Sequence, residues 1–191
     1  MQRPHEAKRK AIVESAAELF ASRPFHEVRL DDIAEAAHVG KGTLYTYFKS
    51  KDDLYGSLVL QGFTELVERV KAETSSESGS AWGALSSIIR QLVSWARGSP
   101  HVFQLMRHGQ QNPPIPGLRE KRQELARLIE ATIARGVRRG ELVDPHPVLT
   151  AQFILSSVRG ALRFGPPNVG QETLTNQLLH ILRQGIQRKK G

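Results

Sequence analysis

The sequence predicts an all-α protein with about nine helices. Apolar residues recur at helical spacing along almost the whole chain, and no segment shows the sustained period-two alternation, bounded by turns, that is typical of a β-hairpin. With 39% hydrophobic and 24% charged residues, the 191-residue chain has enough apolar side chains to bury a core. It is therefore expected to be globular rather than disordered.

Three short helices are expected within residues 7–48. The first has one apolar face and ends before Pro24, and the second is separated from the third by a tight turn at residues 38–40. Leu44 and Phe48, four residues apart, mark the inner face of the third helix. The apolar positions of the first two helices are Ile12, Ala16, Leu19, Phe20, Leu30, Ile33, Ala34 and Ala37.

The remaining helices are separated by segments that disfavour helix. A polar stretch covers residues 74–80, three prolines fall within 110–117, and Gly140 follows two arginines as a C-terminal cap. The helices are expected at 51–72, 82–96, 102–109, 118–137, 148–164 and 174–186. This organisation predicts two domains, 1–54 and 55–191, with the helix from Lys51 linking them.

The second and third helices have the features of a helix-turn-helix, in which the second helix of the pair enters the DNA major groove. His38 stands where the turn needs a left-handed residue, Val39 fills the angle between the helices, and Gly40 is the expected N-cap. With Leu44 and Phe48 facing inward, the outward positions are Lys41, Gly42, Thr43, Tyr45, Thr46 and Tyr47. Lysine and tyrosine reach phosphates, and threonine offers a hydroxyl and a methyl to base edges.

Residues 31–54, DDIAEAAHVGKGTLYTYFKSKDDL, closely resemble the DNA-binding signature of the TetR family of bacterial transcriptional regulators. The resemblance is close over residues 7–60, whereas beyond residue 75 only the helical layout is similar. It implies a homodimer that binds a near-palindromic operator in double-stranded DNA, and a larger helical domain for effector binding and dimerisation. The bases would be read by Lys41, Gly42 and Thr43, and the phosphates bound by Tyr45, Tyr47 and Lys51.

Three positions depart from the family pattern. Arg29 replaces the usual threonine cap of the second helix, so we expect that cap to be lost and Arg29 to contact a phosphate instead. His38 replaces a turn glycine, and Gly40 replaces a serine that contacts a phosphate. Lys49, in a stretch from Lys41 to Lys51 that contains no acid, is a further candidate for phosphate binding.

The larger domain has candidates for two surfaces. Small residues in 148–164 and the leucines of the last helix suit either a four-helix dimer interface or packing within one subunit, and the resemblance favours the dimer. These candidates are Ser156, Gly160, Ala161, Leu178 and Leu182. An effector pocket would be lined by large apolar side chains with a few polar anchors. Its candidates are Trp82, Trp95, Phe103, Met106, Phe153, Arg159, Arg163 and Phe164, any of which alternatively fills the core or the surface.

Other classes of site find little support. The chain has no cysteine, its seven histidines lack ligand spacing, and neither a nucleophile elbow nor a phosphate-binding glycine loop is present. We therefore expect no metal, no cofactor and no catalytic residue. Without a membrane-spanning apolar stretch or a signal sequence, we expect a cytoplasmic protein.

The charge distribution refines the expected DNA contact. The formal net charge is +8, but residues 1–54 contain nine basic and nine acidic residues, so the whole surplus lies in residues 55–191. The leading hypothesis is a repressor that a small-molecule effector releases from its operator. The alternatives are a constitutive or partner-gated DNA-binding protein without a small-molecule ligand and, as the weakest, a helical enzyme or interaction module.

Overall fold

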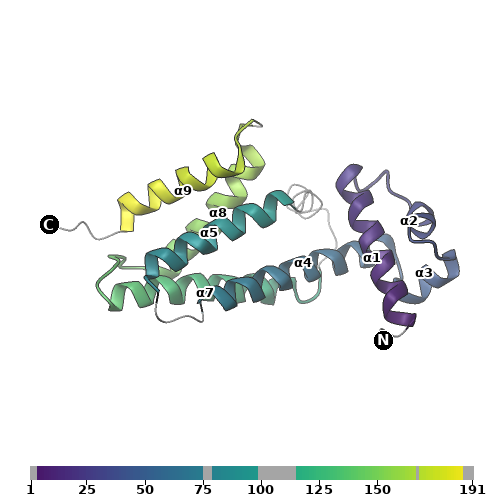
Figure 1. Cartoon of the computed structure of the whole chain (residues 1–191), viewed down its shortest axis with the longest axis horizontal. Coiled ribbons are helices and arrows are strands. Elements are labelled where there is room, and N and C mark those ends of the chain that lie inside the picture. Colours follow the sequence, from purple (N-terminus) through teal and green to yellow (C-terminus); the bar gives the residue numbers. More distant parts are fainter. Residues whose placement is uncertain (1–3, 75–78, 99–114, 167, 187–191) are drawn as a thin grey trace. The chain divides into compact units, whose positions relative to one another are not determined.

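The structure is a computed structural model of the chain that describes residues 4–74, 79–98, 115–166 and 168–186. Across these ranges it contains α-helices and no β-strand, which confirms the predicted all-α class (Figure 1). The helices are α1 (Pro4–Ser22), α2 (Leu30–Ala36), α3 (Lys41–Tyr47), α4 (Lys51–Thr74), α5 (Ala81–Gly98), α7 (Leu118–Arg138), α8 (Pro147–Phe164) and α9 (Gln171–Ile186). The helix expected at 102–109 lies outside the described residues.

The contacts within the chain define two compact units. Among the described residues, the first unit comprises 4–62 and 115–118, and the second comprises 63–74, 79–98, 119–166 and 168–186. The expected domain boundary at residues 54 and 55 falls inside α4, which runs from the first unit into the second. The two units are described separately below.

The first unit is built around an apolar core shared by α1, α2, α3 and the beginning of α4. The predicted inner faces are confirmed, because the apolar residues of each short helix meet in this core. An aromatic cluster closes one side: the ring centroid of Tyr55 lies 4.9 Å from that of Phe20 and 4.8 Å from that of Phe25. The buried members are Ile12, Val13, Ala16, Phe20, Val28, Ile33, Ala34, Ala37, Leu44, Phe48, Leu54, Tyr55 and Leu58.

The second unit consists of the C-terminal part of α4 together with α5, α7, α8 and α9. In this unit α9 packs against α5 and α8, and α5 also packs against α8 (Figure 1). Helix α5 is buried along most of one face, as its strongly segregated apolar pattern predicts. Its buried apolar residues are Ala81, Leu85, Ile88, Ile89, Leu92, Val93, Trp95 and Ala96.

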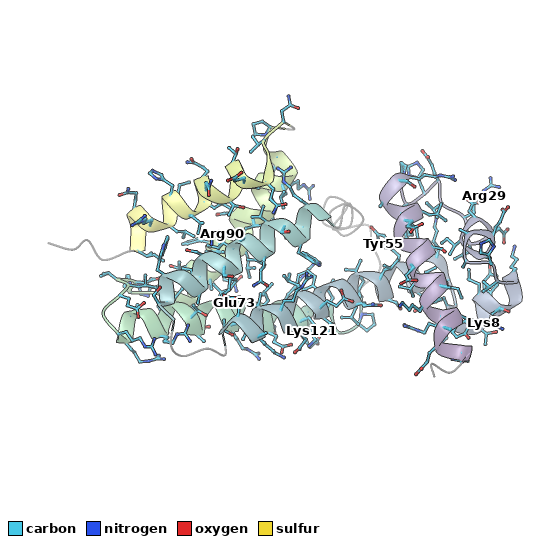
Figure 2. All side chains as sticks on the ribbon, viewed as in Figure 1. Lys8, Arg29, Tyr55, Glu73, Arg90 and Lys121 are labelled. Atoms are coloured by element: carbon cyan, nitrogen blue, oxygen red, sulfur yellow. The ribbon has the colours of Figure 1, made fainter. Side chains whose placement is uncertain are left out.

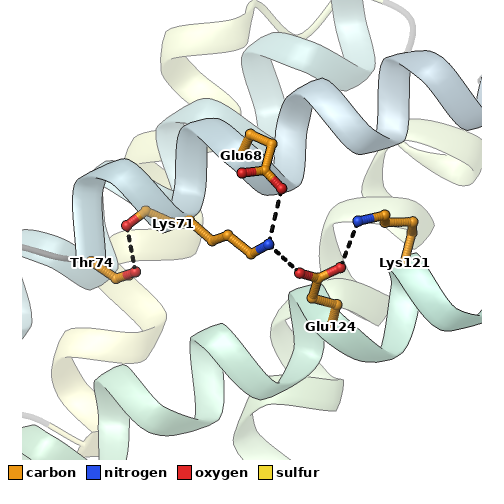
Figure 3. Close-up of polar contacts among 5 residues, drawn as sticks. All are labelled: Glu68, Lys71, Thr74, Lys121 and Glu124. Atoms are coloured by element: carbon orange, nitrogen blue, oxygen red, sulfur yellow. Dashed lines mark hydrogen bonds and ion pairs between the residues drawn. The ribbon is translucent and has the colours of Figure 1, made fainter.

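An ion-pair network joins α4 to α7 in the second unit (Figure 3). The Lys71 ammonium lies between the carboxylates of Glu68, at 2.9 Å, and of Glu124 on α7. Lys121 also pairs with Glu124, at 2.8 Å. Hydrogen bonds from the two lysines lower the pKa of Glu124, and those from Lys71 to Glu124 and Glu68 raise the pKa of Lys71. The network therefore stabilises the charged forms of Glu124 and Lys71.

The C-terminal end of α7 is fixed by two glycines. Gly140 has a φ of 69°, in the left-handed region, and Glu141 N donates to Gly136 O at 2.9 Å, so the predicted glycine cap is confirmed. Gly136 allows α7 to approach its neighbours closely. A Cβ at this position would lie 2.6 Å from Leu142 Cδ1 and 2.7 Å from Ala81 Cβ.

Candidate nucleic-acid interface and effector site

The turn between α2 and α3 has the conformation that the sequence predicts. His38 has a φ of 53°, in the left-handed region, and Val39 N donates to Ala34 O at 2.9 Å. Val39 packs against the core of the first unit, so it fills the angle between the two helices. Gly40 is the N-cap of α3, with extended backbone and no capping side chain. The local geometry is that of a helix-turn-helix.

Helix α3 presents one face to the core and leaves the other available. Leu44 is fully buried, whereas Lys41, Gly42 and Tyr45 are exposed, Tyr45 to 48%. Thr43 is half-buried. The Thr46 hydroxyl donates to Gly42 O at 2.9 Å, so its proton is used within the helix. Lys41, Gly42 and Thr43 thus lie together at the start of α3, where base-reading residues of a recognition helix are found.

Two residues proposed as phosphate ligands also hold the first unit together. The Tyr47 hydroxyl donates to His5 O at 3.0 Å, and the Tyr47 ring centroid lies 4.5 Å from that of His5. The Lys51 ammonium donates to Phe25 O at 2.7 Å and to Val28 O at 3.0 Å. It also lies 4.3 Å from the centroid of the Phe25 ring. In the free protein, both polar groups are therefore engaged within the chain.

Lys49 and Arg29 are exposed at opposite ends of the helix-turn-helix. The Lys49 ammonium makes no ion pair or hydrogen bond with any of the described residues, whereas its backbone N–H donates to Asp53 at 2.9 Å. The cap of α4 is the Ser50 hydroxyl oxygen, which accepts from the backbone N–H of Asp53 at 3.1 Å. Arg29 lies at the start of α2 (Figure 2). The Arg29 side chain does not cap α2, as expected, but its backbone N–H donates to Asp32 at 3.2 Å. The Asp32 carboxylate thus makes one of the two hydrogen bonds of a capping box, the one that accepts from the backbone N–H of the N-cap residue.

Lys41 is paired with an acid of the neighbouring helix. Its ammonium lies 2.7 Å from Asp31 Oδ1 and 2.9 Å from Asp31 Oδ2. The hydrogen bond and the negative charge of Asp31 raise the pKa of Lys41, so the ammonium stays charged. Sequence reasoning missed this contact, because ten residues separate the two side chains and only the turn geometry brings them together.

The candidate effector residues that lie in the described ranges differ widely in exposure. Trp95 is buried and Trp82 is half-buried, but Phe153 is 64% exposed and Phe164 80% exposed. Arg159 and Arg163 are also exposed on α8. Phe103 and Met106 lie outside the described residues. Phe153 and Phe164 thus lie on an exposed face of α8 in the single chain, because α8 is apolar on two faces and periodicity alone did not tell them apart. Their place in an effector pocket stays a prediction.

A different group of residues comes together in the second unit. The ring centroids of Phe63 on α4 and Trp95 on α5 are 4.9 Å apart in an edge-on arrangement. The Arg122 guanidinium of α7 lies 5.9 Å from the Phe63 centroid. Arg122 is an exposed residue of α7, but partial desolvation of its guanidinium, together with the positive charge of Arg159, lowers its pKa. Phe63 and Arg122 were not predicted as site residues, since their spacing gave no signal beyond an amphipathic helix.

The candidate dimer residues lie on surfaces of α8 and α9. Ser156 is exposed, while Gly160, Ala161, Leu178 and Leu182 are half-buried in the single chain. Leu149 and Phe153 continue the face of Ser156 and Gly160 at helical spacing, and both are exposed. Ile181 is exposed beside Leu178 and Leu182 on α9. The two helices thus carry exposed apolar side chains next to small residues.

No group of three or more His, Asp and Glu side chains is placed to hold a metal ion within the described ranges. In the same part of the chain, none of the helices is both long and apolar enough to cross a membrane.

Comparison with known proteins agrees with this geometry. The family model "Bacterial regulatory proteins, tetR family" matches residues 12–58, which include α2 and α3. The HTH-type transcriptional regulator RutR of Escherichia coli is 30% identical over 163 residues, covering 84% of this chain and 76% of that protein. The fatty acid metabolism regulator protein of Bacillus subtilis is 26% identical over 186 residues, covering 93% and 95%.

A solved structure shares the fold over almost the full length of both chains. Bacillus subtilis FadR in complex with stearoyl-CoA has a TM-score of 0.75 and 23% identity, and the match covers 92% of this chain and 98% of that one. The helix-turn-helix geometry, the family match and the relative at 30% identity lead to one conclusion. This chain belongs to the TetR family of bacterial transcriptional regulators and is a DNA-binding regulator.

Proposed function

We propose that this regulator is a repressor that binds a near-palindromic operator as a homodimer and is released by a small-molecule effector. The observation that carries the DNA-binding part is the exposed start of α3, where Lys41, Gly42 and Thr43 follow the turn of the helix-turn-helix. A Cβ at Gly42 would meet no atom within 4 Å, so the surface is open there to a base pair. Tyr45, Lys49 and Arg29 flank it as phosphate ligands.

The roles of Tyr47 and Lys51 at phosphates are compatible with their contacts inside the chain. An ammonium has three donors, of which Lys51 uses two for Phe25 O and Val28 O. The Tyr47 hydroxyl donates its proton to His5 O but retains acceptor capacity for a water bridge to DNA. We assign these residues a dual role: Tyr47 ties α3 to α1, Lys51 ties α4 to the loop between α1 and α2, and the remaining hydrogen-bonding capacity of both is directed to the DNA backbone.

The exposed apolar side chains of α8 and α9 support the homodimer. Phe153 and Phe164 of α8 and Ile181 of α9 are the most exposed of them, and a soluble monomer rarely leaves such a patch uncovered. Two copies of α8 and α9 related by a two-fold axis would form a four-helix interface. Gly160 has open space around it, so a partner helix can approach closely there.

For the effector, we propose an amphipathic molecule with an anionic group. Phe63 and Trp95 provide an apolar wall, and the guanidinium of Arg122 stands over it without an ion pair to any described carboxylate. The amide oxygen of Gln91, one helical turn before Trp95, has no hydrogen-bond partner among the described residues. An anion would relieve the repulsion between Arg122 and Arg159. Acyl-CoA thioesters have this character, and a stearoyl-CoA complex is known for FadR of Bacillus subtilis.

Operator release tests this proposal. A duplex selected by the protein from a random library serves as operator, and its displacement is followed by fluorescence anisotropy with stearoyl-CoA, coenzyme A and stearate. We expect stearoyl-CoA to displace the operator and Arg122→Met to weaken that displacement without changing operator affinity. Arg90→Met, at an exposed arginine of α5, is the matched control. Displacement by none of the three probes would favour the alternative of a partner-gated regulator.

A further inference from the structure

The pair between Asp31 and Lys41 joins the two helices of the helix-turn-helix at the surface that faces DNA. Asp31 is the second residue of α2 and Lys41 the first of α3. Both carboxylate oxygens lie within 3 Å of the ammonium, at 2.7 and 2.9 Å, although both side chains are more than half exposed. Lys41 is thus held in one position by a charge that is itself accessible to the approaching duplex.

The pair affects the two kinds of DNA acceptor differently. A phosphate oxygen carries negative charge, so at the Lys41 ammonium it would be repelled by the adjacent carboxylate of Asp31. A base edge is neutral, and guanine presents two acceptors, O6 and N7, in the major groove. Because an ammonium has three donors, Lys41 retains at least one proton for a base edge while it remains paired.

We propose that Asp31 is a specificity-determining residue that directs Lys41 toward neutral base acceptors and away from phosphates. The inference rests on the proposed function, in which Lys41 reads bases. Asp31 acts through Lys41 as a positioning residue: it lowers affinity for DNA of any sequence more than affinity for the operator. Its effect is therefore a larger ratio between the two affinities, which is the quantity that matters in a genome.

The test compares Asp31→Asn with the wild-type protein on two duplexes. One duplex is selected by the wild-type protein from a random library, and the other is a scrambled version of equal length. We expect Asp31→Asn to bind the scrambled duplex on the order of fivefold more tightly per subunit, the effect of one charge interaction at about 4 Å in water. Affinity for the selected duplex should rise less. The salt dependence on the scrambled duplex should steepen by about 0.9 for each new phosphate contact.

Three further variants make the result specific. Glu35→Gln removes one negative charge from the same helix at an exposed residue that does not pair with Lys41, and it should leave the affinity ratio near that of the wild type. Asp31→Glu keeps the negative charge, so its ratio of affinities for the selected and scrambled duplexes should be closer to that of the wild type than the ratio of Asp31→Asn. In a Lys41→Met background, Asp31→Asn should no longer change the salt dependence, because no ammonium remains that could leave the carboxylate and contact a phosphate.

Two results would overturn the proposal. Equal effects of Asp31→Asn and Glu35→Gln on the ratio and the salt dependence would show that only the general charge of α2 matters. An undiminished effect of Asp31→Asn in the Lys41→Met background would show that Asp31 does not act through Lys41. Failure of the wild-type protein to select any duplex is a separate outcome, and it would overturn the proposed base reading itself.

Discussion

The hydroxyl of Tyr47 donates to the carbonyl oxygen of His5 at 3.0 Å and thereby ties the recognition helix α3 to the start of α1. The two rings also contact each other, with centroids 4.5 Å apart and planes inclined by 54°. Because Tyr47 is the last residue of α3, this contact holds the helix at the end opposite the turn. The position of the DNA-facing surface therefore depends on a residue for which the family resemblance implied phosphate binding, and which also packs against the core of the first unit.

Replacement of Tyr47 should separate the ring contact from the hydrogen bond. Tyr47→Phe removes only the hydroxyl and should lower the free energy of unfolding by about 1 kcal/mol, the usual net contribution of one hydrogen bond. Tyr47→Ala removes the ring as well and should lower it further. Urea unfolding followed by circular dichroism measures both. Equal stability of Tyr47→Phe and the wild type would mean that the hydrogen bond to His5 contributes nothing in solution.

Lys51→Met should destabilise the first unit, although it replaces a lysine at a half-buried position with an apolar side chain of similar length. The variant leaves Phe25 O and Val28 O without the ammonium and removes the contact with the Phe25 ring. We expect a loss of about 1–3 kcal/mol in the free energy of unfolding. Lys49→Met is the matched control, because it should reduce the salt dependence of DNA binding but leave stability unchanged. The idea fails if both variants unfold at the same urea concentration.

The network around Glu124 should make stability depend on pH. The pKa of Glu124 is lowered by hydrogen bonds from Lys121 and Lys71, so the unfolded chain binds its proton more readily than the folded chain. The stabilisation is complete above the ordinary glutamate pKa of about 4.3 and is lost as the pH falls through the lower folded value. The difference in unfolding free energy between wild type and Glu124→Gln should therefore shrink at acid pH. A difference that stays constant between neutral and acid pH would contradict this.

Gly136→Ala should destabilise the second unit despite the higher helix propensity of alanine. The new Cβ would overlap Leu142 Cδ1 and Ala81 Cβ, at 2.6 and 2.7 Å. Overpacking of this kind costs about 1–3 kcal/mol, more than the gain of about 1 kcal/mol from replacing a helical glycine. At Gly185 of α9 a Cβ meets nothing within 4 Å, so Gly185→Ala should stabilise. Thermal unfolding distinguishes the two variants, because the Tm should fall for Gly136→Ala and rise for Gly185→Ala.

Phe153→Asp should disrupt the homodimer without unfolding the subunit. Phe153 is exposed in the single chain, so the substitution costs little there, but it places an unpaired charge in the proposed interface. Sedimentation equilibrium should show monomers at concentrations at which the wild type is dimeric. Ser94→Asp, at an exposed position of α5, is the control and should remain dimeric. A dimeric Phe153→Asp variant would place the interface elsewhere.

Much of the helix-turn-helix was predictable from the sequence because its determinants are local. The left-handed φ of His38, the N-cap at Gly40 and the inward faces of Leu44 and Phe48 each follow from a few neighbouring residues. The same holds for Gly140 at the end of α7. Family membership was recognisable for the same reason, since the matched segment is short and continuous.

The tertiary structure decided which polar and aromatic side chains have partners within the chain. The sequence placed Lys41, Tyr47 and Lys51 on the DNA-facing segment, but Asp31, His5 and Phe25, which engage them, come from other helices and loops. Likewise, the apolar pattern of α8 identified Phe153 but not the face on which it lies. Local sequence determines helix boundaries and turn conformation through backbone sterics, whereas side-chain partners depend on packing between segments distant in the chain.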